Sequence, residues 1–523
     1  MASIHKLHTD ILWSIFTFNT GPPLTSTSSR NIENCLRPLT VTRQSSQVCR
    51  SWRQILLQSS SLWGRLIDLN QLGQKNRLWA DEVVRRSGFA LLWIYGDMHP
   101  QGSMEANEDF FFSVLDRIER IQILEVEVQD GVDHNDQGWD ILLRPAPCLQ
   151  FFKLSYSQPL LQNSQRPIFA NRAPSLLSFD THQVPFAIDA PWLSHIRDIR
   201  FPLEFTIRQV LELCCRMPHL ETFHPSDSFD INMVFIEPLP RMHLPFLSSI
   251  QLTTGLVNAL TFLDHITPAP GCSLSLHTND GIRVTAHVTP RMLETAPSIL
   301  SRRMVDYFSY HAPTRIRVEF TPVALSFLDV SYRPDDSDCK FVIQLSPWYA
   351  RNRTGHVLLS QAFLFPPASL ACLVSVKEVE LFLYDIHPTM YPGLRSILQA
   401  CHSVNKIAIS FDSISYLTGI ETLSDRILYS CLQNLSDRII FPHLQTLQVD
   451  LDKGYNHEVI DMAKFLRFLK KYRDNGSPLS LLKLTDYQEE DPLNIDALNE
   501  MADLTVQWMS GEEVVESVGG RRT

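Results

Sequence analysis

The sequence predicts an α/β protein in which a small N-terminal unit of three helices precedes an irregular solenoid of strands and helices with a curved, mostly parallel sheet. Three observations carry this prediction. Apolar residues recur at helical spacing over about the first 70 residues. A short apolar pattern then recurs along most of the remaining chain, and helix candidates lie between its occurrences. A strand, a crossover helix and a further strand favour a parallel sheet with right-handed connections.

Composition excludes several classes of protein. The chain has 523 residues, of which 44% are hydrophobic, so a sizeable core is available. It carries 46 Lys and Arg against 57 Asp and Glu, a net charge of −11, which disfavours nucleic acid as a partner. No apolar run reaches the ~18 residues of a membrane span, and we expect no membrane partner.

The ten cysteines are scattered and form no C-x-x-C pair. Cys214, Cys215 and Cys401 lie in apolar segments, which indicates reduced cysteines in the core of a cytoplasmic or nuclear protein. Only 19 residues are glycine, which disfavours glycine-rich phosphate-binding loops.

The N-terminal unit reads as three short helices. The first is predicted at Leu7 to Phe18 with Thr9 or Asp10 as its N-cap, and a polar loop follows from Asn19 to Asn34. Pro38 begins the second helix, the third contains Trp52, and Leu62-Trp63 leads toward a strand at Leu66 to Leu69. Below ~70–80 residues a core seldom suffices alone, so this unit needs a partner surface.

Two segments of this unit resemble an F-box. Leu7 to Phe16 (L-H-T-D-I-L-W-S-I-F) is similar to the opening helix, with His8 where F-boxes usually have proline. Ser46 to Ile55 (S-Q-V-C-R-S-W-R-Q-I), followed by Ser61-Leu62-Trp63, is similar to the second half. The polar insert between the two halves is typical of fungal F-box-like proteins.

The resemblance implies docking onto a Skp-type adaptor, and through it a cullin, within a ubiquitin ligase. Trp52 fits a core position as well as an interface, and the apolar face of the first helix fits packing on the repeat region as an alternative. The residues that the resemblance assigns to adaptor binding are Leu7, Ile11, Leu12, Ile15, Phe16, Val48, Cys49 and Trp52.

The repeated pattern is apolar-x-x-apolar, often followed by x-apolar, and proline frequently stands two residues before its first position. Three of its spacings are 27 residues, within the ~20–29 residues of leucine-rich repeats. Such a spacing has room for one strand and one helix of about ten residues. The first positions are Leu149, Leu176, Leu193, Leu220, Leu247, Val376, Val404, Leu444 and Leu479.

These patterns predict four regions. An F-box-like domain occupies residues 1–70, and connecting helix and strand units occupy 71–145. A leucine-rich-repeat-like solenoid follows at 146–510, and a disordered tail at 511–523. Thr206 begins one of the helices of the repeat region with a capping box.

Motifs for chemistry are absent from the sequence: there is no nucleophile elbow, P-loop, dinucleotide fingerprint or H-E-x-x-H. Asp133 to Asp136 gathers ligand-type side chains but reads as a solvated loop. We therefore expect no catalytic residue, metal ligand or cofactor.

The predicted function is that of a substrate-recognition subunit of a Skp–cullin–F-box ubiquitin ligase, with an unknown protein substrate. Alternatives are a scaffold acting outside a ligase and an enzyme with a site built from distant residues. Side chains between the apolar positions are the candidates for substrate contact: Gln150, Lys153, Glu221, Gln251, Lys377, Lys406 and Gln448.

Overall fold

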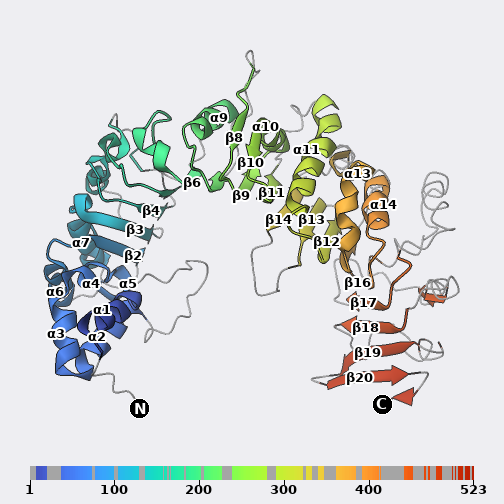
Figure 1. Cartoon of the computed structure of the whole chain (residues 1–523), viewed down its shortest axis with the longest axis horizontal. Coiled ribbons are helices and arrows are strands. Elements are labelled where there is room, and N and C mark those ends of the chain that lie inside the picture. Colours follow the sequence, from blue (N-terminus) through green and yellow to red (C-terminus); the bar gives the residue numbers. More distant parts are fainter. Residues whose placement is uncertain are drawn as a thin grey trace. The chain divides into compact units, whose positions relative to one another are not determined.

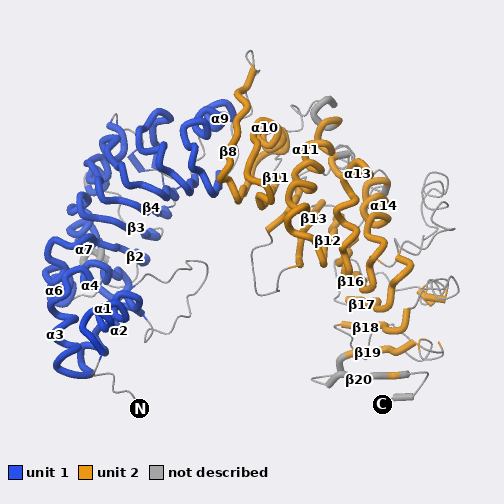
Figure 2. The backbone as a smooth tube through the Cα atoms, viewed as in Figure 1, with its two compact units in different colours: residues 1–226 blue, residues 227–523 orange. Residues whose placement is uncertain are grey.

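The chain is described here by a computed structural model. It describes residues 7–20, 37–72, 77–98, 104–128, 136–156, 166–181, 184–201, 205–225, 238–279, 290–321, 325–331, 340–346, 361–383, 391–410, 441–450, 479–485, 504–510, 513–518 and 521–522, with isolated residues between some of these ranges. Two compact units make up the chain, residues 1–226 and residues 227–523 (Figure 2). Each unit combines helices with a parallel or mostly parallel set of strands, which confirms the α/β class.

The first unit begins with the predicted helices and one that was not predicted. They are α1 (Thr9–Phe18), α2 (Pro38–Val48), α3 (Arg50–Gln58) and α4 (Ser60–Gly64). Pro38 stands at the first position of α2, where its fixed φ suits a helix and its missing N–H is not needed. The polar insert lies largely outside the described residues.

Two local predictions about these helices are wrong. Thr9 and Asp10 already lie inside α1, and the N-cap is His8, whose Nδ1 accepts a hydrogen bond from the Asp10 N–H at 3.4 Å. The second is the lack of a helix at Leu62 and Trp63, which lie in α4, although β1 (Ile67–Asp68) then falls within the strand expected at Leu66 to Leu69. The Trp63 indole N–H donates to the Leu56 carbonyl at 2.8 Å, which folds α4 back onto α3 and buries both side chains.

Among the described residues of the first unit, seven parallel strands follow in chain order. Figure 1 labels β2, β3, β4 and β6 of this set. They are β1 (Ile67–Asp68), β2 (Leu92–Met98), β3 (Ile121–Val128), β4 (Phe151–Tyr156), β5 (Ser178–Thr181), β6 (Asp198–Phe201) and β7 (Thr222–Pro225). Each strand therefore pairs with the one before it in the sequence, as expected when every connection is a crossover of the same hand.

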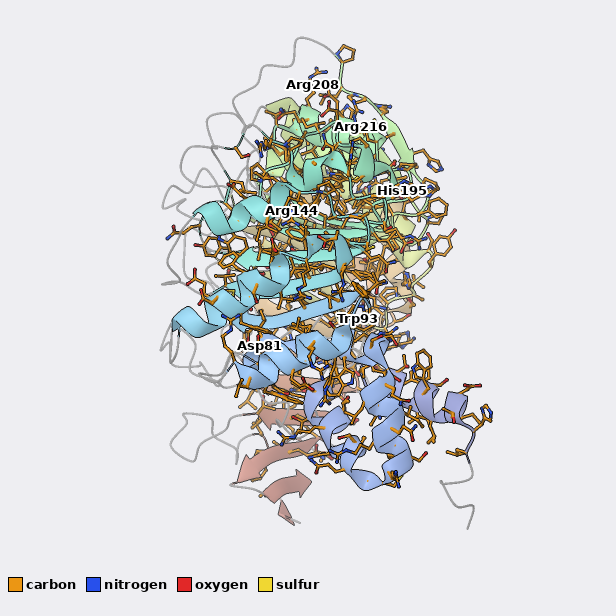
Figure 3. The ribbon with its side chains drawn as sticks, turned by 90° about the vertical axis from the view of Figure 1, so that its left-hand side faces the viewer. Asp81, Trp93, Arg144, His195, Arg208 and Arg216 are labelled. Atoms are coloured by element: carbon orange, nitrogen blue, oxygen red, sulfur yellow. The ribbon has the colours of Figure 1, made fainter. Side chains whose placement is uncertain are left out.

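Helical segments connect these strands and differ in length. They are α5 (Leu69–Leu72), α6 (Leu78–Ser87), α7 (Met104–Leu115), α8 (Asp136–Trp139), α9 (Ile207–Cys215) and the 3-10 turns η3 (Ile118–Arg120), η4 (Asp140–Leu143), η5 (Ile168–Asn171) and η6 (Pro191–His195). Figure 3 looks onto this helical side, with Asp81 on α6 and Arg208 on α9. The expected helix of about ten residues is thus replaced by a short 3-10 turn in several connections, and the capping box at Thr206 is confirmed.

One turn recurs before the strands and explains the proline pattern. At Ala146 to Leu149, Ala173 to Leu176 and Met217 to Leu220, the N–H of the leucine donates to the carbonyl three residues earlier, each at 3.2 Å. The same bond closes Leu244 to Leu247 and Phe441 to Leu444. Proline occupies the second position of each of these turns, where its fixed φ favours a β-turn.

The turn places its leucine in the core and aligns the next residue with the preceding strand. The N–H after the leucine donates to the corresponding residue of the previous repeat, as in Leu177 to Gln150 (2.9 Å), Glu221 to Arg197 (2.7 Å) and Gln445 to Asn405 (2.8 Å). The first positions of the pattern and the residues three further on are buried, including Leu149, Phe152, Leu220, Phe223, Leu247, Ile250, Leu444 and Leu447.

The second unit has a mostly parallel set of strands with one antiparallel insertion. Pairings run in the order β9, β11, β14, β13, β12, β15, β16, β17, β18, β19, β20, β21. Strand β12 (Arg315–Phe320) pairs parallel with β15, and β14 (Phe341–Ser346) pairs parallel with β11. Between them β13 (Leu325–Asp329) runs antiparallel to both, so the order of successive strands is reversed there.

The remaining strands of the second unit are β8 (Met242–Leu244), β9 (Ser249–Thr254), β10 (Ile266–Pro268), β11 (Ser273–Asn279), β15 (Glu378–Leu383), β16 (Lys406–Ser410), β17 (Thr446–Asp450), β18 (Leu481–Thr485), β19 (Thr505–Ser510), β20 (Glu513–Val518) and β21 (Arg521–Arg522). Strands β8 and β10 form a separate parallel pair. Strand β20 is antiparallel to β19, which contradicts the expected disorder of the tail. Its Val-Val pair suits a strand, which the polar composition of the tail obscured.

The helices of the second unit are α10 (Leu256–His265), α11 (Pro290–Phe308), α13 (Pro367–Leu370) and α14 (Tyr391–Ala400), with 3-10 turns η7 (Gln361–Phe363) and η8 (Ala371–Ser375). Among the described residues, no helix is both long and apolar enough to cross a bilayer.

Replacing Leu247 by alanine should lower the free energy of unfolding by ~2–5 kcal/mol, because the side chain is fully buried and its removal leaves a cavity. The matched control is Phe246→Ala in the same turn, whose side chain is 54% exposed and whose loss should change stability by less than about 1 kcal/mol. Urea unfolding of the full chain measures both. Equal effects of the two changes would show that the turn does not direct its leucine into the core.

Candidate functional site

The first candidate site is the N-terminal helical unit, and its core determines which side chains remain for a partner. Leu12 and Phe16 are buried together with Leu56 and Leu62, and Trp52 packs against this cluster. The Phe16 and Trp52 rings meet edge to face with centroids 5.1 Å apart. These contacts join α1 to α3, so the two halves of the F-box-like pattern form one core.

The residues of the V-C-R-x-W-R pattern contribute more to this core than to the exposed surface. The Cys49 Sγ accepts a hydrogen bond from the Trp52 N–H at 3.5 Å and thereby caps α3. Trp63 is buried beneath Arg86, whose guanidinium lies 4.6 Å from the indole ring. Val48 is different, because it ends α2 with its side chain 59% exposed.

An apolar stripe remains exposed along α1. Ile11, Ile15 and Phe18 follow one another at spacings of four and three residues, which places them on one side of α1, and Leu7 lies just before the N-cap, His8. The side chains of Leu7, Ile11, Ile15 and Phe18 are exposed by 37%, 50%, 39% and 88% respectively. Large apolar side chains exposed in a contiguous row are typical of interaction surfaces. We call these four residues the α1 stripe.

The structure therefore divides the residues assigned to adaptor binding. Leu12 and Phe16 are buried in the chain's own core, and Cys49 and Trp52 are half-buried. Leu7, Ile11, Ile15 and Val48 remain exposed. Phe18 belongs to the same surface but was not assigned to the site. Its position seven residues after Ile11 was the signal that could have identified it.

Asp68 connects the helical unit to the first strand. Its carboxylate lies 3.6 Å from the Arg37 guanidinium at the start of α2 and accepts the backbone N–H groups of Asn70 (3.0 Å) and Gln71 (3.3 Å). The Gln71 side chain donates in turn to Thr40 of α2 at 3.2 Å. Burial raises the pKa of Asp68, and Arg37 opposes that rise. These contacts hold α2 against β1 and α5.

A comparison with known proteins gives no relative: neither the family models nor the curated proteins contain a significant match to this chain. The resemblance to F-box-like proteins therefore stays a prediction based on the residues quoted for it.

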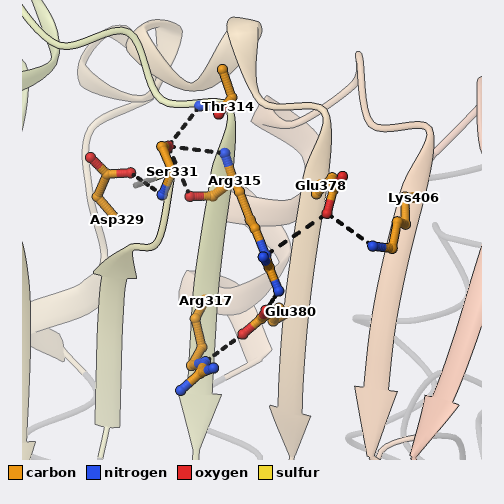
Figure 4. A network of polar contacts seen from close by, with 8 residues as sticks. All are labelled: Thr314, Arg315, Arg317, Asp329, Ser331, Glu378, Glu380 and Lys406. Carbon is orange, nitrogen blue, oxygen red and sulfur yellow. Dashed lines mark hydrogen bonds and ion pairs between the residues drawn. The ribbon is translucent and has the colours of Figure 1, made fainter. Parts of the chain in front are cut away.

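The side chains predicted to contact a substrate are partly held by ion pairs. Lys406 on β16 lies 3.1 Å from Glu378 on β15, and Glu378 lies 3.8 Å from Arg315 on β12 (Figure 4). Glu380 is almost fully buried between Arg315 and Arg317. In the first unit, Lys153 lies 2.9 Å from Glu125, and Glu221 lies 3.2 Å from Arg197. These pairs align neighbouring strands, and the network around Glu378 and Glu380 sets three cations, Arg315, Arg317 and Lys406, against two carboxylates.

A second candidate site could have supported an enzyme. On β11, the Ser275 hydroxyl lies 3.0 Å from His277 Nε2, and His277 Nδ1 lies 2.9 Å from Gln344 Oε1 on β14. This order of hydroxyl, imidazole and amide occurs in nucleophilic enzymes. However, β11 pairs with β9 on one edge and β14 on the other, so its backbone N–H groups serve the sheet rather than an oxyanion. We interpret the cluster as a hydrogen-bonded chain on the sheet.

Groups of metal-ligating side chains do not occur among the described residues. Asp133 to Asn135 lie outside those residues, and Asp136 begins α8.

The cysteine prediction needs one correction. Cys214 and Cys401 are buried, but Cys215 is exposed, because α9 turns it away from the core that receives Cys214. Burial raises the pKa of Cys401 to about 12 and raises the pKa of Cys214 further still.

Maleimide should therefore modify Cys215 at least about tenfold faster than Cys214 in the native chain, because a thiol must be accessible and deprotonated to react. Peptide mapping by mass spectrometry after short labelling measures both sites in one sample. Labelling in denaturant is the control and should make the two rates similar. Equal labelling of the native chain would contradict the burial of Cys214.

Proposed function

We propose that the chain is a substrate-recognition subunit of a Skp–cullin–F-box ubiquitin ligase, acting in the cytoplasm or nucleus. The N-terminal helices would bind a Skp-type adaptor, and the turn and strand repeats, in leucine-rich-repeat-like manner, would bind the substrate. The protein would perform no chemistry itself. It would raise the local concentration of a substrate near the ligase.

The α1 stripe is the observation that carries this proposal. The stripe is apolar, exposed and supported from beneath by the Leu12 and Phe16 core. Burying such side chains in a partner stabilises a complex by roughly 25 cal/mol for each Å² of apolar surface removed from water. The exposed Val48 at the end of α2 belongs to the F-box-like pattern as well and is a second candidate contact.

The double change Ile11→Asp with Ile15→Asp should weaken binding of the full chain to a purified Skp-type adaptor at least about 100-fold, about 2.7 kcal/mol, because it places two carboxylates in an apolar interface. Both side chains are exposed in the free chain, so its folding should persist. Calorimetric titration measures the affinity, and circular dichroism checks the fold.

The matched control is Leu364→Asp with Val374→Asp, two apolar residues of the second unit with 42% and 46% exposure. This control should bind the adaptor as tightly as the unmodified chain. Undiminished binding by the folded α1 variant would overturn the proposal. Adaptor binding that never recruits a cullin would favour a scaffold outside a ligase.

A further inference from the structure

One row of side chains crosses β2, β3 and β4 near the start of each strand. The register places Trp93, Ile123 and Phe151 beside one another, and we call these three residues the apolar row. Phe151 is 44% exposed, and Trp93 and Ile123 are half-buried. Neighbours along the strands, such as Ile94 and Phe152, are buried, so the row lies on the opposite face of the sheet.

This surface is narrow along the strands. The next side chain on the same face of β2 is Tyr95, which is buried. On β3 and β4 the next side chains are Glu125 and Lys153, which pair with each other at 2.9 Å and neutralise one another. A partner that uses the apolar row therefore runs across the strands rather than along them.

A chain of hydrogen bonds beside the apolar row fixes the direction of two side-chain amides. An indole N–H can only donate, and the N–H of Trp93 lies 2.8 Å from Gln122 Oε1. Gln122 therefore turns its NH₂ group to Gln150, whose Oε1 accepts at 3.0 Å. The NH₂ group of Gln150 ends the chain and has no acceptor among the described residues. A partner beside Phe151 thus meets a hydrogen-bond donor.

The other end of the apolar row carries a cation. Arg65 follows α4 and precedes β1, which pairs with the edge of β2 opposite β3. Its guanidinium lies 4.4 Å from the centroid of the Trp93 ring. No carboxylate or carbonyl of the described part of the chain pairs with this guanidinium. Burial lowers the pKa of Arg65, and no described acid opposes that effect.

The chemistry of Arg65 indicates what such a partner carries. A guanidinium stacked on an aromatic ring is held in place and keeps its N–H groups for bidentate pairing with a carboxylate. Phosphate groups on peptides are usually bound by clusters of arginine, whereas a single arginine matches a single carboxylate. The rigid Trp93 and Phe151 rings lose little entropy when an apolar side chain packs on them.

We propose that the apolar row binds an extended, acidic segment of the substrate, with one Asp or Glu about three residues from a bulky apolar side chain. The carboxylate would pair with Arg65, the apolar side chain would rest on Ile123 and Phe151, and a peptide carbonyl would accept from Gln150. Arg65 lies two to three strand spacings from Ile123 and Phe151, roughly 10–14 Å, which an extended segment spans in three or four residues.

This inference rests on the proposed function, because it assigns the substrate class of the same subunit. The chain carries a net charge of −11, which disfavours acidic partners over most of its surface. Binding of an acidic segment would therefore depend strongly on the one cation at the apolar row, and changing that cation should have a large effect.

The test uses fluorescent peptides of about 12 residues in a serine and glycine background, with an amidated C-terminus. Each carries one Phe and one Asp separated by one to six positions. Anisotropy titrations with the full chain should give the tightest binding at a separation of three or four. Replacing the peptide's Asp by Asn should weaken binding at least about tenfold, and so should Phe151→Ser in the protein.

Arg65→Glu is the decisive variant, because it should reverse the preference so that a peptide with Lys binds more tightly than the peptide with Asp. A folding defect would not produce such a reversal. Arg65→Gln is the milder variant and should bind the Asp and Asn peptides equally. The matched control is Arg216→Glu, an exposed site that follows α9 on the helical side, which should leave the preference unchanged (Figure 3).

Peptide binding that ignores the Asp, the Phe and the Arg65 variants would overturn this inference, as would no binding up to about 1 mM. A dimer that Phe151→Ser converts to a monomer would assign the row to a second copy of the chain and would also overturn it. Adaptor binding is measured on the same samples. A chain that binds the adaptor but none of the peptides would overturn this inference alone, whereas loss of adaptor binding by the unmodified chain would overturn the proposed function.

Discussion

The fold depends on one hydrogen bond that recurs before the strands of both units. The N–H of a leucine or valine donates to the carbonyl three residues earlier, as at Leu149, Leu220, Val376 and Leu444. This bond reverses the chain, buries the apolar side chain and leaves the next N–H to pair with the preceding repeat. Proline at the second position, where it is present, lowers the entropy lost when the turn forms. The turn therefore places each strand beside the previous one in a parallel sheet.

Because the constraint is local, the residues between two turns can vary in number and structure. Leu176 and Ile196, which close the turns before β5 and β6, are 20 residues apart and enclose the 3-10 turn η6, whereas Ile196 and Leu220 are 24 apart and enclose α9. The same freedom admits the order β11, β14, β13, β12, in which only β13 runs antiparallel to its neighbours. Outside this insertion, strand pairing is regular although the repeat length is not.

The difference between local patterns and contacts between distant segments explains what could be predicted from the sequence. Strand β3 (Ile121–Val128) and the capping box at Thr206 were predictable because both are local patterns. The antiparallel β13 was not, because nothing within a strand specifies the direction of its neighbour. On α1, Ile11 and Leu12 are both apolar and both fit the helical spacing, so the sequence alone does not tell which of the two is buried. Only the position of α3 shows that Leu12 is covered while Ile11 stays exposed.

An exposed apolar stripe on α1 is the central feature of the functional account, and hydrogen–deuterium exchange of the full chain with and without a Skp-type adaptor tests it most directly. The account predicts slower exchange on adaptor binding in residues 7–20 and 48–54, with the amides of β2 to β7 unchanged. Slower exchange confined to those strands, with α1 unaffected, would contradict it.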